Sequence, residues 1–168
     1  NELRQSWRWA PLDREVLLVE GDDARWFLHS QLAQDIEALV DGGSAWSLLL
    51  SPDGKVDALL RVVRRDQLTF TLDVEEGFGA RVAARLMRFR LRAKVTIEQV
   101  QWEVRGVLTD SSAPPPGLVG VAVPGWGTEH RFDIVAPAAE MPSGGTEVDG
   151  SVLHAARVDA GWPAMGID

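Results

Sequence analysis

Residues 48–64 read LLLSPDGKVDALLRVVR, and this stretch decides the fold class. Its centre, SPDG at 51–54, is a strong turn signal, because proline presets φ and glycine supplies a left-handed position. Apolar runs flank the turn and predict strands over 45–50 and 56–63. A third run, 68–74, follows a polar turn, so the three segments predict a β-meander.

Outward from the meander, strands and helices do not alternate strictly. Residues 15–20 predict a buried strand, and the break at 21–23 offers an aspartate N-cap to a helix that runs to about residue 34. Residues 89–98 alternate between apolar and polar side chains, which predicts a half-buried strand. The other expected elements are helices over 77–88 and 149–159 and strands over 101–109, 119–123 and 131–135. This order favours an α+β fold over a doubly wound parallel sheet.

The best internal boundary is SSAPPPG at 111–117, which cannot pack as a regular element. We therefore expect a first α/β subdomain over 1–110 and a proline-rich linker over 111–118. Residues 119–168 are expected to be part of a second subdomain that continues beyond the end of the chain.

Composition excludes several classes of function. The 168 residues carry a formal net charge of −8, and an acidic surface repels phosphate backbones, so nucleic-acid binding is disfavoured. The chain has no cysteine and three widely separated histidines, which predicts no metal site. No apolar run approaches the ~20 residues of a membrane helix. We expect a cytoplasmic protein.

Asp57 is the first candidate site residue, because it lies on the strand that follows the glycine turn. Such a turn can project a carboxylate into a pocket. Taken alone, the pattern favours a surface turn with a solvent-facing aspartate.

A second candidate is the segment GWGTEHRFDI at 125–134. Glycines allow a ligand to approach the backbone closely, and Trp126 can stack on a planar ring. Glu129 can accept two hydrogen bonds from an amino-pyrimidine edge. In isolation the segment favours a hairpin with exposed polar residues.

The third candidate is a cationic stretch without any acid. Its helical members share one face by their i, i+4, i+7 spacing, and its strand members share the face opposite the apolar set. The stretch can bind a carboxylate-rich tail, a phosphate or an acidic protein surface, or it can be a solvated face paired with nearby glutamates. It consists of Arg81, Arg85, Arg88, Arg90, Arg92 and Lys94.

Four segments together resemble one superfamily, the folate-binding YgfZ-like proteins, which are relatives of the aminomethyltransferase (T-protein) of glycine cleavage. They are VLLVEGDDARWFLHSQLAQDI at 16–36, LLLSPDGKVDALLRVVR at 48–64, ARVAARLMRFRLRAKVTI at 80–97 and ARVDAGWPAMGID at 156–168. The resemblance spans nearly the whole chain. It implies an α+β core of two interlocked β-α-β subdomains, tetrahydrofolate or a derivative as cofactor, and an auxiliary role in the assembly or maintenance of iron–sulfur proteins.

The resemblance also assigns residues. The family's Gly-Tyr-x-Gly-Glu pterin-contacting segment resembles residues 125–129, so Glu129 is the leading ligand contact and Arg157 on the later helix a second one. The transferase's catalytic acids align at Ala58 and Leu59, so Asp57 lies one or two positions early and is expected on the opposite strand face. This offset argues against aminomethyl transfer. The family's Lys-Gly-Cys motif would follow residue 168.

Three functions remain open at this point. The first is a folate-binding auxiliary factor in iron–sulfur metabolism. The second is an aminomethyltransferase-type enzyme that uses Asp57. The third is a protein-interaction module that docks a partner on the cationic stretch.

Overall fold

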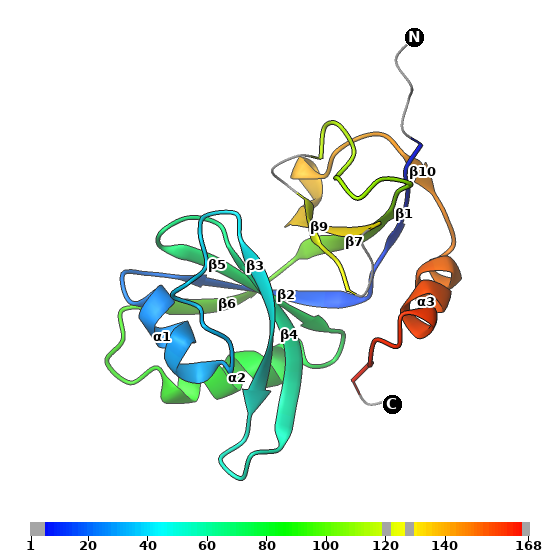
Figure 1. Cartoon of the computed structure of the whole chain (residues 1–168). Helices are drawn as coiled ribbons and strands as arrows, with labels where there is room; N and C mark the ends of the chain where they lie inside the picture. Colours follow the sequence, from blue (N-terminus) through cyan, green and yellow to red (C-terminus); the bar gives the residue numbers. More distant parts are fainter. Residues whose placement is uncertain (1–5, 119–121, 127–129, 166–168) are drawn as a thin grey trace. The chain divides into compact units, whose positions relative to one another are not determined.

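The computed structural model describes residues 6–118, 122–126 and 130–165 (Figure 1). The described residues form two five-stranded sheets, one in each of two compact units. We call Arg14–Gln101 the central unit, and Asn1–Asp13 together with Trp102–Asp168 the terminal unit. The mixture of helices and sheets confirms the predicted α+β class.

The central unit is an antiparallel sheet with two helices. The strand order is β3-β4-β5-β2-β6, and the predicted meander forms its first three strands. In chain order the elements are β2 (Arg14–Glu20), α1 (Ala24–Gln31), β3 (Ser44–Leu50), β4 (Val56–Arg64), β5 (Thr69–Glu75), α2 (Gly79–Phe89) and β6 (Thr96–Val100).

Both helices of the central unit bury their apolar stripes in one core on the same face of the sheet. Phe27 of α1 and Leu86 of α2 are fully buried there, together with Leu60 and Leu72 of the sheet. Each such side chain stabilises the fold by about 1.5–3 kcal/mol relative to its exposed state. Alternate strand residues, such as Arg61 and Asp73, therefore lie on the other face.

The terminal unit is built around a second sheet of order β10-β1-β7-β9-β8. Strands β1 and β10 are parallel, and the other neighbouring pairs are antiparallel. Its elements are β1 (Arg8–Pro11), β7 (Trp102–Leu108), β8 (Ala122–Pro124), β9 (Arg131–Pro137), the short 3-10 helix η1 (Ala138–Glu140), β10 (Thr146–Glu147) and α3 (Gly150–Asp159).

The units divide the chain differently from the expected boundary at 111–118. The chain passes between units after Asp13 and after Gln101, and residues 111–118 belong to the terminal unit. The reason is strand pairing, because β1 pairs antiparallel with β7 and thereby joins the first residues to the later sheet. A boundary read from local composition does not detect such a non-local pair.

The prediction of a strand over 89–98 is wrong for residues 89–95 and holds only for 96–98. Helix α2 continues to Phe89, a turn follows, and β6 begins only at Thr96. The turn places Leu91 at φ 49°, a left-handed conformation that leucine rarely adopts. The apolar and polar side chains that alternate over 89–98 therefore belong to a helix end, a turn and the start of a strand, and not to one strand.

The N-cap prediction for α1 also needs correction. Asp23 occupies the N-cap position, but its side chain makes no capping hydrogen bond. Its Oδ2 instead accepts a hydrogen bond from the backbone N–H of Lys94 at 2.7 Å. This bond ties the turn after α2 to the start of α1.

Candidate functional site

A β-bulge sets the position of Asp57. In the β3–β4 pair Leu49 faces Ala58 and Leu50 faces Val56, so Asp57 is the extra residue between two registers. The turn before it is closed by the Gly54 N–H, which donates to the Ser51 carbonyl at 2.8 Å. Gly54 has φ 81°, the left-handed conformation that the sequence predicted for it.

The bulge changes the direction of the Asp57 side chain. Asp57 Oδ1 lies 3.6 Å from Arg81 Nη2, and Arg81 belongs to α2. The neighbouring Val82 of α2 packs in the same core as Ala58. Asp57 therefore faces the helix-covered side, whereas strict alternation would have turned it away from Ala58. The expectation that Asp57 lies on the strand face opposite Ala58 is therefore wrong, and it no longer argues against a catalytic role for Asp57.

Asp57 and α2 enclose a cleft of about 230 Å³. Its charged lining is one carboxylate and three guanidinium groups, those of Arg81, Arg85 and Arg88. We call it the Asp57 cleft. The local charge is positive in an otherwise acidic chain, and guanidinium groups bind carboxylates and phosphates with matched geometry.

Arg85 is the most constrained cation of the Asp57 cleft. Its Nη2 donates to the Leu50 carbonyl at 3.0 Å, and its guanidinium carbon lies 4.4 Å from the Phe89 ring centroid. Its Nε is buried and makes no hydrogen bond to the described residues. An unsatisfied buried donor is costly, and the Arg85 side chain would have to rotate to present this N–H to an acceptor in the cleft.

The six-residue cationic stretch thus divides into two groups. Arg81, Arg85 and Arg88 line the Asp57 cleft, as their helical spacing predicted. Arg90 and Arg92 lie in the turn that follows α2, and they line a different hollow. Lys94 lies in the same turn, before β6 begins at Thr96. The shared strand face expected for the last three residues does not exist.

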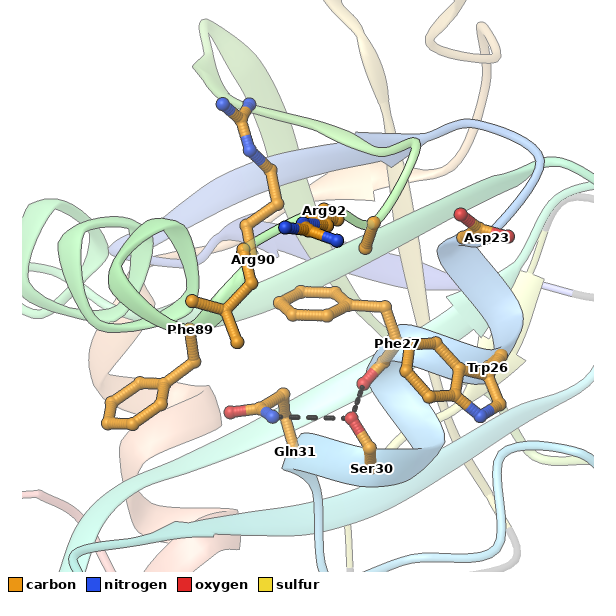
Figure 2. A pocket seen from close by; sticks show the side chains of 10 residues that line it. Asp23, Trp26, Phe27, Ser30, Gln31, Phe89, Arg90 and Arg92 are labelled. Atoms are coloured by element: carbon orange, nitrogen blue, oxygen red, sulfur yellow. Dashed lines mark hydrogen bonds between the residues drawn. The ribbon is translucent and has the colours of Figure 1, made fainter.

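The second hollow lies between α1 and the turn after α2, and its volume is about 850 Å³ (Figure 2). We call it the α1 groove. Trp26, Phe27, Phe89 and Leu91 give it an apolar lining, and Arg90 and Arg92 stand at its edge. Sequence reasoning missed this groove. The available signal was Trp26, a large apolar residue that lies off the buried stripe of α1.

The remaining predicted ligand contacts belong to the terminal unit. Glu129 lies outside the described residues. Trp126 is only 8% exposed, and the Arg131 guanidinium lies 4.6 Å from its ring centroid, so a cation already covers one ring face. Arg157 of α3 donates from Nη1 to the Trp162 carbonyl at 2.6 Å, which links the helix to the segment that follows it.

A buried ionic cluster, also missed from sequence, lies in the central sheet. Asp73 accepts hydrogen bonds from Arg14 and Arg61, and the Trp46 ring centroid lies 5.3 and 5.0 Å from their guanidinium carbons. Burial alone would raise the pKa of Asp73, but Arg61 and Arg14 outweigh it and hold the pKa below its usual value of 3.8. The cluster joins β2, β4 and β5, so we assign it to structure.

The described residues contain no group of three or more histidine, aspartate or glutamate side chains that is placed to hold a metal ion. Within 6–118, 122–126 and 130–165, every helix is too short or too polar to traverse a bilayer.

Comparison with known proteins shows the fold. No protein-family model matches the chain. The chain is 23% identical over 153 residues to an uncharacterized protein of Haemophilus influenzae, a match that covers 90% of this chain and 52% of that protein. It is also similar to the crystal structure of the glycine cleavage system aminomethyltransferase T from Bartonella henselae, with a TM-score of 0.66 and 19% identity.

The structural match covers 80% of this chain and 43% of the aminomethyltransferase. The chain therefore has an aminomethyltransferase T-like fold, and it spans about half the length of each of these two proteins.

Proposed function

We propose that the protein binds tetrahydrofolate or a derivative, and that it acts as a YgfZ-like auxiliary factor in the assembly or maintenance of iron–sulfur proteins. The observation that carries this proposal is the aminomethyltransferase T-like fold over 80% of the chain. It agrees with the resemblance seen independently in four sequence segments. A cytoplasmic location, two interlocked β-α-β subdomains and iron–sulfur proteins as partners belong to the same proposal.

The chemistry of a folate suits the residues assigned to it. The pterin ring presents an amino-pyrimidine edge that donates hydrogen bonds to a carboxylate, and the glutamate tail presents carboxylates that pair with guanidinium groups. We assign the ring to Glu129 in the terminal unit, with Arg157 as a further contact. Trp126 is not assigned a stacking role, because it is only 8% exposed and the Arg131 guanidinium covers one face of its ring. As a separate site, the cationic Asp57 cleft of the central unit offers Arg81, Arg85 and Arg88 to an anion, and it is not assigned to the folate bound by the terminal unit.

The test is a titration with tetrahydrofolate that follows tryptophan fluorescence, since the chain contains seven tryptophans. We expect saturable binding that Glu129→Gln weakens by about tenfold, the effect of one lost charge-assisted hydrogen bond. Glu140→Gln, an exposed acid on η1, is the matched control and should bind as the wild type does. The absence of a saturable signal in the wild-type protein would rule out the folate proposal.

The iron–sulfur role needs a separate readout. In cells that lack the gene, the activity of an iron–sulfur enzyme should fall and should return with the wild-type gene but not with Glu129→Gln. Full rescue by Glu129→Gln would separate folate binding from the iron–sulfur role.

The Asp57 bulge favours a second candidate function, an aminomethyltransferase-type enzyme. A half-buried carboxylate beside Arg81 can hold and orient a protonated nitrogen or accept its proton in the cleft. A methylene-transfer assay on wild type and Asp57→Asn decides this. Equal activity of the two proteins removes Asp57 from any mechanism, whereas a loss of about a hundredfold supports general acid–base or positioning chemistry.

A further inference from the structure

The α1 groove has unusual exposed apolar side chains. Trp26 is 61% exposed and Leu91 is 87% exposed, and both line the same hollow of about 850 Å³. Figure 2 shows the rings of Trp26, Phe27 and Phe89 around this hollow. A large exposed apolar surface inside a concave site is typical of a binding groove.

Backbone strain at Leu91 is a second, independent observation. Its φ of 49° makes it the one non-glycine residue with positive φ among the described residues. Glycine would adopt this conformation without strain, and the Leu91 side chain contributes almost nothing to the core because it is so exposed. A strained backbone that presents a leucine to solvent points to a contact outside the chain.

Charge defines the chemistry of the occupant. Two cations line the groove, Arg90 and Arg92. Neither forms a salt bridge with the described residues, and Arg90 donates a 3.4 Å hydrogen bond to the Val95 carbonyl. Asp23, the acid of the groove, is engaged with the Lys94 backbone. The edge of the groove is therefore cationic, and its occupant should be anionic.

We propose that the α1 groove binds an acidic peptide segment of a partner protein. In this arrangement a large apolar side chain of the segment enters between Trp26 and Leu91, and flanking carboxylates pair with Arg90 and Arg92. A nucleic acid fits less well because only two cations line the groove, whereas nucleic-acid affinity comes from neutralising a run of phosphates. A flat membrane surface fits less well because the apolar groups line a hollow. The groove shares no lining residue with the Asp57 cleft, so the proposal is independent of folate binding.

The test measures fluorescence anisotropy of a short labelled peptide that carries a Leu-Phe pair flanked by glutamates. Leu91→Ser and Arg92→Gln should each weaken binding by about tenfold, and added salt should weaken the wild-type complex. Val40→Ser is the control for an exposed apolar residue outside the groove, and Arg81→Gln is the control for a cation of the other cleft. Both controls should bind as the wild type does. Tetrahydrofolate titration of Leu91→Ser and Arg92→Gln should be unchanged, because neither residue belongs to the terminal unit or lines the Asp57 cleft, and this separates a failure here from a failure of the folate proposal.

Several outcomes would overturn the proposal. One is equal binding of a peptide in which serines replace the Leu-Phe pair, and another is the absence of saturable binding by wild type. Binding to phosphatidylserine vesicles that Leu91→Ser abolishes, without peptide binding, would assign the groove to a membrane. Self-association that Leu91→Ser abolishes in sedimentation would assign the groove to a second copy of the chain.

Discussion

Arg61 and Asp73 face each other directly across β4 and β5, and both side chains are completely buried. Arg61 Nε and Nη2 donate to the two carboxylate oxygens of Asp73 at 2.9 and 3.0 Å, a bidentate pair. Arg14 adds a third hydrogen bond to the same carboxylate from β2. One acid therefore fixes the register of three neighbouring strands.

The first prediction concerns the loss of this acid. Asp73→Asn should reduce the free energy of unfolding by about 3–5 kcal/mol, because it removes the buried charge to which both Arg61 and Arg14 donate hydrogen bonds. Urea unfolding at neutral pH measures the change. Asp57→Asn is the matched control and should cost less than about 1 kcal/mol, because its ion pair with the exposed Arg81 is long. Similar losses for both variants would contradict the structural role of Asp73.

The second prediction is a pH dependence of the same variant. The pKa of Asp73 is lower in the folded chain than its ordinary value of 3.8, so its stabilisation is complete above that pH and is lost as the pH falls toward the folded pKa. The stability difference between wild type and Asp73→Asn should therefore shrink only below pH 3.8. Urea unfolding at descending pH checks this, and a difference that already shrinks near neutral pH would refute it.

The third prediction compares two glycines with similar backbone angles. Gly54 and Gly145 have φ of 81° and 70°, but a Cβ at Gly145 would lie 2.5 Å from Trp7 Cε3, while a Cβ at Gly54 would meet nothing within 4 Å. Gly54→Ala should cost about 1 kcal/mol from backbone strain alone. Gly145→Ala should cost at least about 1 kcal/mol more, because the Trp7 ring must also move. Equal melting temperatures would show that Trp7 does not pack on Gly145.

The fourth prediction separates stability from binding at Leu91. Leu91→Gly relieves the left-handed strain and removes a side chain that packs on almost nothing, so the melting temperature should be no lower than in wild type. Binding of the acidic peptide should fall by about tenfold in the same variant. Calorimetry and anisotropy on one preparation give both values. A clear drop in melting temperature would show that Leu91 has a packing role.

Local patterns in the sequence predicted much of the central unit. The turn at 51–54 and the apolar runs around it predict β3, β4 and β5 within two residues of their bounds, and the predicted helix over 77–88 overlaps α2. These signals work because turn chemistry and side-chain periodicity act over a few residues. The alternation over 89–98 gave a wrong strand prediction because a local pattern of apolar and polar residues does not reveal the left-handed conformation of Leu91, which lies in a turn.

The site was less predictable because its geometry depends on non-local partners. The bulge that turns Asp57 toward Arg81 arises from the register with β3, which the residues around Asp57 do not encode. The pairing of Arg61 with Asp73 likewise needs the β4–β5 register. The helical spacing of Arg81, Arg85 and Arg88 did predict their common face, because that relationship lies within one helix.

The pairing of β1 with β7 has a consequence for biosynthesis. Pro11 pairs with Arg105, and the Leu12 N–H donates to the Val104 carbonyl at 2.8 Å, so the two crossings between units are anchored on adjacent strands. As the ribosome extends the chain, β1 emerges early but has no partner until all of Arg14–Gln101 has been made. The nascent chain should therefore complete the central unit first. During this time β1 has unpaired backbone N–H and C=O groups to which chaperones can bind.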